Sequence, residues 1–124
     1  MKNILVVTGG AGFVGSNLID YLVKSTKFKI LSIDNYSTGK KNNHNSSRRV
    51  KYINGNTQNI SKLIGKYKNN IKTVFHFGEF SRIFQSFAKF SECFKYNSIG
   101  TNEVFNFCLI IIELNKLHLV LIYL

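Results

Sequence analysis

The sequence lacks proline altogether and has only two alanines and three arginines among its 124 residues. Lysine, asparagine, isoleucine and phenylalanine are abundant instead. The abundant residues have A/T-rich codons and the scarce ones mostly need G or C, so we interpret the net charge of +11 as a coding bias. The lysines are spread along the chain, with one local basic cluster within residues 40–51, whereas nucleic-acid binding usually relies on a basic stripe or a recognised module. We therefore expect no nucleic-acid partner.

Cysteine is also scarce, and Cys93 and Cys108 fit neither a C-x-x-C motif nor a Cys/His metal site. We expect two reduced thiols and no metal. Nothing at the start of the sequence resembles a signal peptide, so the expected location is cytoplasmic. The apolar stretch 108–124 is interrupted by polar and charged residues and falls short of the about 20 apolar residues that a membrane-spanning helix needs. We expect no membrane span.

Short apolar runs alternate with amphipathic patterns at the spacing of β-α-β units. We predict strands over residues 3–8, 28–34, 50–55, 73–77 and 119–123. Helical patterns cover residues 16–22, 60–67 and 84–109, and residues 35–49 form a polar loop. There are no repeats and no linker. The sequence therefore predicts one α/β domain over residues 1–124, a Rossmann-type doubly wound parallel sheet that is truncated after about five strands.

The first strand runs directly into a glycine-rich turn that opens a helix. Gly10, Gly12 and Gly15 satisfy G-x-G-x-x-G, and Gly9 with the last two satisfies G-x-x-G-x-x-G. A side chain at Gly12 would keep a pyrophosphate away from the backbone, and one at Gly15 would push the helix off the sheet. Strand, tight turn and helix aim backbone N–H groups and a positive helix end at a phosphate. In this context the pattern predicts a dinucleotide site.

An acidic residue strengthens this prediction. Asp34 lies nineteen residues after Gly15, at the end of the second strand, close to the spacing of about 20 expected for an acid that binds ribose. Its carboxylate would accept hydrogen bonds from the ribose hydroxyls and repel a 2′-phosphate, which favours NAD. Two lysines and two arginines within residues 40–49 leave NADP as the less favoured alternative.

Residues 8–16 and 33–39 together resemble the extended short-chain dehydrogenase/reductase family, and within it the NAD-dependent nucleotide-sugar epimerases and dehydratases. Further segments match in order: Gly55-Asn56 resembles the adenine-contacting Gly-Asp, residues 74–79 the V-x-H-L-A-A strand end, and residues 97–101 the helix motif N-x-x-G-T. The resemblance covers about residues 2–108. With the glycine turn and Asp34, it assigns cofactor contacts to Gly9, Gly10, Gly12, Phe13, Val14, Gly15, Asp34, Asn35, Ser37, Thr38, Gly39, Asn56, Thr57, Phe77, Gly78, Glu79 and Asn97.

The sequence departs from the family pattern at several of these positions. Asn56 replaces the usual Asp, although its carbonyl oxygen can still accept a hydrogen bond from an adenine amino group. Glu79 places a carboxylate beside the expected nicotinamide pocket, as a substrate contact, as a proton acceptor or as a solvent-facing loop residue. Ser86 matches the family's serine ten residues after the strand histidine. We interpret that histidine, His76, as structural rather than catalytic.

The largest departure is the lack of a helix with Tyr-x-x-x-Lys, with which these enzymes transfer the proton while hydride moves to and from the nicotinamide. Only Tyr36 has a lysine four residues later, and that pair lies in the loop after Asp34. We therefore assign no catalytic residue. The resemblance implies the NAD-binding portion of a nucleotide-sugar epimerase or dehydratase, whose intact form acts by transient hydride transfer at a sugar carbon. This chain alone is expected to be inactive and to bind NAD weakly or not at all.

Two alternatives remain from other functional classes: a non-catalytic dinucleotide-binding module and, less favoured, a basic nucleic-acid-binding protein. In relatives of this type the helix resembling residues 90–108 pairs with the Tyr-Lys helix and with a partner subunit. Without that neighbour we expect association, with a homodimer as one form, through phenylalanines left exposed. The candidates are Phe84, Phe87, Phe90, Phe94, Phe105 and Phe107.

Overall fold

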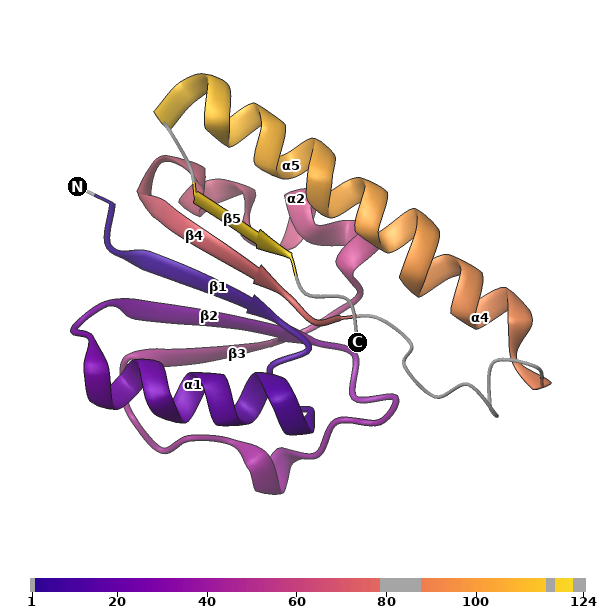
Figure 1. Cartoon of the computed structure of the whole chain (residues 1–124), viewed down its shortest axis with the longest axis horizontal. Helices are drawn as coiled ribbons and strands as arrows, with labels where there is room; N and C mark the ends of the chain where they lie inside the picture. Colours follow the sequence, from indigo (N-terminus) through magenta and orange to yellow (C-terminus); the bar gives the residue numbers. More distant parts are fainter. Residues whose placement is uncertain (1, 79–87, 116–117, 122–124) are drawn as a thin grey trace.

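The computed structural model describes residues 2–78, 88–115 and 118–121, and these contain a five-stranded parallel sheet (Figure 1). The strand order is β3-β2-β1-β4-β5. The strands are β1 (Ile4–Thr8), β2 (Lys29–Asp34), β3 (Val50–Asn54), β4 (Ile71–His76) and β5 (His118–Leu121). All five predicted strands are present, with bounds that differ by one or two residues. Residues 122–123 of the predicted fifth strand lie outside the described residues.

Helices cover both faces of this sheet (Figure 1). The helix α1 (Phe13–Ser25) packs on one face, and α2 (Ile60–Ile64) and α5 (Gly100–Asn115) pack on the other. The shorter elements are the 3-10 turns η1 (Lys41–Asn43), η2 (Thr57–Asn59) and η3 (Gly65–Asn70), the helix α4 (Phe90–Phe94) and the π-helical turn η4 (Lys95–Ile99). A parallel sheet with helices on both faces is the predicted doubly wound α/β fold of Rossmann type.

The central strand β1 is buried on both faces, which explains its uninterrupted apolar sequence. Ile4 and Val6 belong to the cluster beneath α2 and α5, whereas Leu5 and Val7 face α1. Successive side chains of a strand point to opposite faces, so one short segment contributes to both cores. Burying a side chain of this size stabilises the fold by about 1.5–3 kcal/mol.

Two helices differ from their predicted bounds. α1 begins at Phe13, three residues before the amphipathic pattern, because the glycine turn itself ends in the helix N-cap at Gly12. The predicted helix over residues 60–67 is α-helical only to Ile64 and continues as η3. Glycine is a poor helix former, and Gly65 stands at this transition. The predicted apolar face is nevertheless correct, since all four of its members pack against one core cluster: Ile60, Leu63, Ile64 and Tyr67.

The helical segment after β4 leaves some of its aromatic side chains exposed. Phe90 and Phe94 are 73% and 52% exposed, as expected, whereas Phe107 is buried in the core because it lies on the face of α5 that meets the sheet. Phe84 and Phe87 lie outside the described residues. Among the helices that the structure describes, none has the length and apolar character to cross a membrane.

Both cysteines are free thiols. Cys108 lies on α5 and is buried in the core, and burial raises the pKa of its thiol to about 12. In residues 2–78, 88–115 and 118–121, no three His, Cys, Asp or Glu side chains are grouped so that they could hold a metal ion.

Candidate functional site

The neighbouring strands β1 and β4 end side by side at the point where the chain changes the direction in which it adds strands to the sheet. From β1 the chain proceeds to β2 and β3 on one side, and then crosses to β4 on the other side of β1. In open α/β sheets, ligands bind beyond the carboxyl ends of the strands at such a point. Thr8 pairs with His76 in register, so the residues that follow each strand lie beside one another.

Three glycines of the turn after β1 are required by the chain's own packing. Gly9 has a φ of +71°, and a Cβ there would lie 2.7 Å from the carbonyl oxygen of Phe77. A Cβ at Gly10 would lie 2.0 Å from Oγ of Ser32, and one at Gly15 would lie 2.1 Å from the carbonyl oxygen of Gly9. The Gly9 and Gly15 distances are to backbone atoms, so the turn packs backbone to backbone against α1 and the end of β4, whereas the Gly10 distance is to a side chain of β2.

Gly12 is different. A Cβ at Gly12 would have only the Gly9 carbonyl oxygen nearby, at 3.4 Å, which is an ordinary contact. The first backbone hydrogen bond of α1 is donated by Ser16 N–H to the Gly12 carbonyl, at 3.0 Å. The N–H groups of residues 13–15 precede that bond, and Gly12 supplies no side-chain cap. The start of α1 therefore combines open space, backbone donors and the positive end of a 13-residue helix, which together suit an anion.

The Asp34 carboxylate joins the end of β2 to the glycine turn. Its Oδ2 accepts a hydrogen bond from Ala11 N–H at 3.0 Å, and its Oδ1 accepts one from Tyr36 N–H at 2.8 Å. An ionised carboxylate has about four acceptor positions, so each oxygen retains one for a further donor. The side chain predicted to bind ribose is thus held in a fixed orientation beside the start of α1.

The predicted polar loop after β2 wraps around Ala11. The Ala11 carbonyl accepts hydrogen bonds from Lys40 N–H at 3.0 Å and from Asn43 Nδ2 at 2.9 Å. A Cβ at Gly39 would lie 2.9 Å from Oδ2 of Asp34, so the loop passes close to the carboxylate. The backbone of this loop is therefore part of the same edge as the glycine turn.

Aromatic side chains fix the far end of the same loop. Tyr36 has a φ of +61°, which is rare for a side chain of its size. Its hydroxyl lies 2.7 Å from Nε2 of His44, whose ring stacks on Tyr52 with ring centroids 3.6 Å apart. The strained backbone at Tyr36 is thus accompanied by a hydrogen bond and a ring contact further along the loop.

Asn56 and Thr57 follow the end of β3, at the start of η2. Oδ1 of Asn56 accepts a hydrogen bond from Nδ2 of Asn35 at 2.9 Å, so one of the two acceptor positions that an adenine amino group could use is already taken. Thr57 is buried, and in the part of the chain that the structure describes its Oγ1 has no hydrogen-bond partner. A Cβ at Gly78 would lie 2.9 Å from Cγ2 of Thr57, which places the ends of β3 and β4 in contact.

A buried network connects β1, β4 and α5. Oγ1 of Thr8 accepts hydrogen bonds from the N–H groups of Phe77 and Gly78, both at 3.0 Å. Both acceptor positions of the hydroxyl are then occupied, so its proton is donated to Nδ1 of His76, 2.6 Å away. Nε2 of His76 therefore carries the ring proton and donates it to Oγ1 of Thr101 at 2.8 Å. Burial lowers the pKa of the His76 imidazole to about 4, which agrees with a structural role for this residue.

Most of the predicted site residues lie at this one edge of the sheet, on residues 9–15, 34–39, 56–57 and 77–78. Phe13 is 83% exposed at the start of α1, and Ser37 and Thr38 are exposed in the loop after β2. Asn97 lies on η4, which packs against η2, and its Nδ2 donates to Sγ of Cys93 at 3.5 Å. Predicted Glu79 and the motif residue Ser86 lie outside the described residues.

Four residues that organise this edge were not predicted from the sequence: Thr8, Ala11, Asn43 and Thr101. A polar residue at the end of each of two neighbouring buried strands is a usable signal for the Thr8–His76 pair, because parallel strands that end together bring their last side chains together. Nothing in the sequence marks the contacts of Asn43 with Ala11, which depend on the path of the loop.

Comparison with known proteins gives the same family as the sequence motifs. Residues 5–120 match the family described as the NAD dependent epimerase/dehydratase family. The chain is similar to the ADP-L-glycero-D-manno-heptose-6-epimerase of Brachyspira hyodysenteriae, with 32% identity over 110 residues that cover 86% of this chain and 33% of that protein.

Solved structures agree with this result. One is the UDP-glucose 4-epimerase of Thermotoga maritima with UDP-glucose, with a TM-score of 0.77, 25% identity and coverage of 87% of this chain and 34% of that one. Another is the Bordetella bronchiseptica enzyme WbmG in complex with NAD, with a TM-score of 0.73, 26% identity and coverage of 87% and 34%. The matched region therefore spans about a third of the length of these proteins.

Proposed function

The chain belongs to the NAD dependent epimerase/dehydratase family, and we propose that it is the NAD-binding portion of a protein that acts on nucleotide-sugars. In the intact form, hydride is transferred transiently at a sugar carbon, as an epimerase or a dehydratase requires. Two similar proteins, one solved with NAD and one with UDP-glucose, support this proposal. The observation that carries it is the open start of α1 at Gly12 beside the oriented carboxylate of Asp34.

The residues at this edge fit the dinucleotide. The pyrophosphate would lie at the start of α1, over Gly12, where the backbone N–H groups of residues 13–15 face it. The ribose hydroxyls would donate to the acceptor positions that remain on Asp34. When bound, the nicotinamide accepts and returns a hydride, and the protein's part is to hold and orient it.

The same carboxylate favours NAD over NADP. A ribose 2′-phosphate would bring a second negative charge against Asp34, whose position is fixed by the Ala11 and Tyr36 N–H groups. Arg49 does not offset this charge, because its guanidinium donates to the carbonyls of residues 23, 26 and 28 near the end of α1. We therefore propose NAD as the cofactor.

The first test is the affinity of the 124-residue chain for NAD, measured by isothermal titration calorimetry. We expect weak but saturable binding, and we expect Gly12→Ala to weaken it about tenfold or more because the methyl group fills the space over the turn. The matched control is Gly65→Ala, whose Cβ meets nothing within 4 Å and lies far along the chain from the turn.

Equal affinity of the wild type and Gly12→Ala would contradict the proposed site. We expect no turnover of UDP-glucose by the chain alone, because we assign it no catalytic residue. Turnover by this chain would contradict that assignment. NAD binding by an intact gene product that has no activity on any nucleotide-sugar would instead support the non-catalytic module.

We also propose that the chain pairs with a second copy through the helical segment from α4 to α5. Six large apolar side chains of this segment are 41% to 73% exposed: Phe90, Phe94, Ile99, Leu109, Ile110 and Ile112. Exposed apolar side chains gathered on one helical segment are typical of an interaction site. The rings of Phe90 and Phe94 stack at a centroid distance of 6.5 Å, so they present one joint surface.

Sedimentation velocity of the chain tests this pairing. We expect concentration-dependent association in the wild type, and a shift toward monomer when Phe90→Ser and Phe94→Ser are combined. Tyr21→Ser on α1 is the control, because Tyr21 is 65% exposed on the opposite side of the sheet. A wild type that stays monomeric over a hundredfold range of concentration would contradict the proposal.

A further inference from the structure

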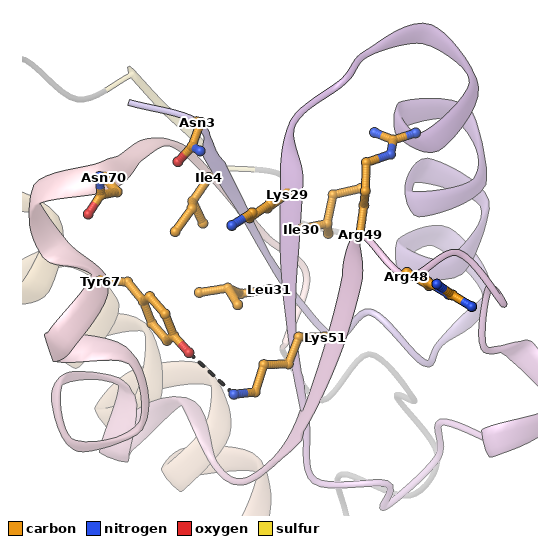
Figure 2. A pocket seen from close by; sticks show the side chains of 10 residues that line it. All are labelled: Asn3, Ile4, Lys29, Ile30, Leu31, Arg48, Arg49, Lys51, Tyr67 and Asn70. Carbon is orange, nitrogen blue, oxygen red and sulfur yellow. Dashed lines mark hydrogen bonds between the residues drawn. The ribbon is translucent and has the colours of Figure 1, made fainter. Parts of the chain in front are cut away.

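A cavity lies at the opposite edge of the sheet from the glycine turn, at the amino ends of β1, β2 and β3 (Figure 2). Its volume is about 530 Å³, within the range of about 300–1,000 Å³ that is usual for small-molecule sites. The lining residues come from these strand ends, from the segment before β3 and from η3: Asn3, Ile4, Lys29, Ile30, Leu31, Arg48, Arg49, Lys51, Tyr67 and Asn70.

The cavity exists because the helical connection between β3 and β4 is short. α2 ends at Ile64, and the chain continues as η3, so this end of the β2–β3 face is not covered by a longer helix. Ile4 and Leu31 supply apolar surface from the sheet, and the Tyr67 ring stands at the side of the cavity (Figure 2). The inner surface is therefore mostly apolar and partly aromatic.

The rim is positively charged. The side chains of Lys29 and Lys51 extend into the space between β1, β2 and η3 (Figure 2), and none of the ten lining residues is acidic. Nζ of Lys51 donates to Oη of Tyr67 at 3.3 Å, and Nζ of Lys66 lies 5.1 Å from the centroid of the Tyr67 ring. The hydrogen bond from Lys51 lowers the pKa of the Tyr67 phenol.

The two arginines contribute differently from the lysines. The guanidinium of Arg49 is directed toward α1, where it donates to the carbonyls of Thr26 and Phe28 at 2.9 and 3.0 Å. The Arg48 side chain points away from the cavity on the other side of β3 (Figure 2). Arg48 and Arg49 also line the cavity, but the cationic side chains that extend into it are those of Lys29 and Lys51, on neighbouring strands.

We propose that this cavity binds a small organic anion in which a phosphate-type group is attached to a flat apolar ring. Lys29 and Lys51 would supply the positive charge that attracts the charged group, and the ring would contact Tyr67 and the apolar side chains of Ile4 and Leu31. The site lies at the other edge of the sheet from Gly12 and Asp34, so it is independent of the proposed function and both sites can be occupied together.

The test is a titration of the ¹⁵N-labelled 124-residue chain with 1-naphthyl phosphate, followed by amide chemical shifts. We expect saturable shifts at Asn3, Lys29, Leu31, Lys51 and Tyr67. Combining Lys29→Gln with Lys51→Gln should weaken binding about tenfold, since two partly exposed charge interactions are lost. The control combines Lys24→Gln with Lys62→Gln, two exposed lysines outside the cavity, and gives the same net charge.

Three results would overturn the proposal. Saturable shifts confined to residues 9–15 would place the ligand at the glycine turn. Equal weakening by the two double variants would indicate general attraction to a basic chain. Equal affinity for inorganic phosphate, or for uncharged 1-naphthol, would show that the cavity does not recognise a ring and a charge together.

Discussion

Gly15→Ala is expected to destabilise the folded chain by about 3 kcal/mol or more. The added Cβ would lie 2.1 Å from the carbonyl oxygen of Gly9 and 2.8 Å from Cα of Gly10, and both atoms belong to the backbone. Relief requires α1 to move off the sheet, although α1 buries Ile19 and Leu22 there. Helix propensity favours alanine by only about 1 kcal/mol, so the steric overlap decides the sign.

Urea unfolding followed by circular dichroism measures this effect. Gly65→Ala is the matched control, because its Cβ meets no atom within 4 Å and its backbone is already in the right-handed helical region. That variant should be neutral or more stable by up to about 1 kcal/mol. Equal unfolding free energies for the Gly15 and Gly65 variants would show that α1 does not pack on the turn as described.

The unfolding free energy is also expected to fall by about 3 kcal/mol as the pH is lowered from 7 to 4, through the protonation of His76. Burial lowers the pKa of its imidazole from 6.5 to about 4 in the folded chain. The unfolded chain therefore binds the proton first, so the stabilisation is fully present above pH 6.5 and is lost as the pH falls through 4. A charged imidazole would also bring an N–H against the hydroxyl proton of Thr8.

Urea unfolding at half-unit pH intervals separates this contribution from the other titrating groups. His76→Asn cannot titrate, so its unfolding free energy should depend less steeply on pH between 6.5 and 4.5, by up to about 1.4 kcal/mol per pH unit. The variant is expected to be less stable at pH 7, because Thr101 loses its partner on Nε2. Parallel pH profiles for the two proteins would contradict the buried, neutral histidine.

The four glycines of the turn after β1 occupy their positions for different physical reasons. Gly9 requires its positive φ, Gly10 and Gly15 require the absence of any side chain, and Gly12 leaves open space. A pattern of identical letters cannot distinguish these cases, because the distances depend on Phe77, Ser32 and the start of α1. The sequence predicted one glycine turn after the first strand, and the structure shows that only Gly12 of its four glycines has room for a Cβ.

The parts of the fold that sequence predicted well are those decided locally. β1 and most of β2 are buried on both faces, and their short runs rich in isoleucine, leucine and valine identify them directly. The end of α2 at Ile64 was not predicted, because the apolar periodicity continues to Tyr67 while the backbone changes to 3-10 geometry. Periodicity reports which side chains face the core and says less about where the hydrogen bonds change.

Long-range polar contacts could not be predicted. Lys29 and Lys51 share one face of the sheet because β2 pairs with β3 in parallel, with Leu31 opposite Lys51, and residues of η3 complete the lining of the cavity beside them. The sequence of the loop after β2 is polar and contains no pattern that predicts its contacts. In the structure, Lys40 N–H and Asn43 Nδ2 donate hydrogen bonds to the Ala11 carbonyl. Such contacts join segments that lie far apart in the sequence, and nothing in the sequence predicts that these segments are close in space.

The attachment of this loop to Ala11 has an energetic consequence. Asp34 and the loop that follows it are already ordered in the folded chain. The conformational entropy of this loop is therefore lost on folding, and its loss does not weaken the binding of a ligand. If the hydrogen bond from Asn43 to Ala11 were weakened, the loop would be less ordered in the free chain. Ligand binding would then have to order the loop, and the affinity would fall. If the proposed dinucleotide binds at Asp34, its affinity depends on the local stability of a segment that need not touch it.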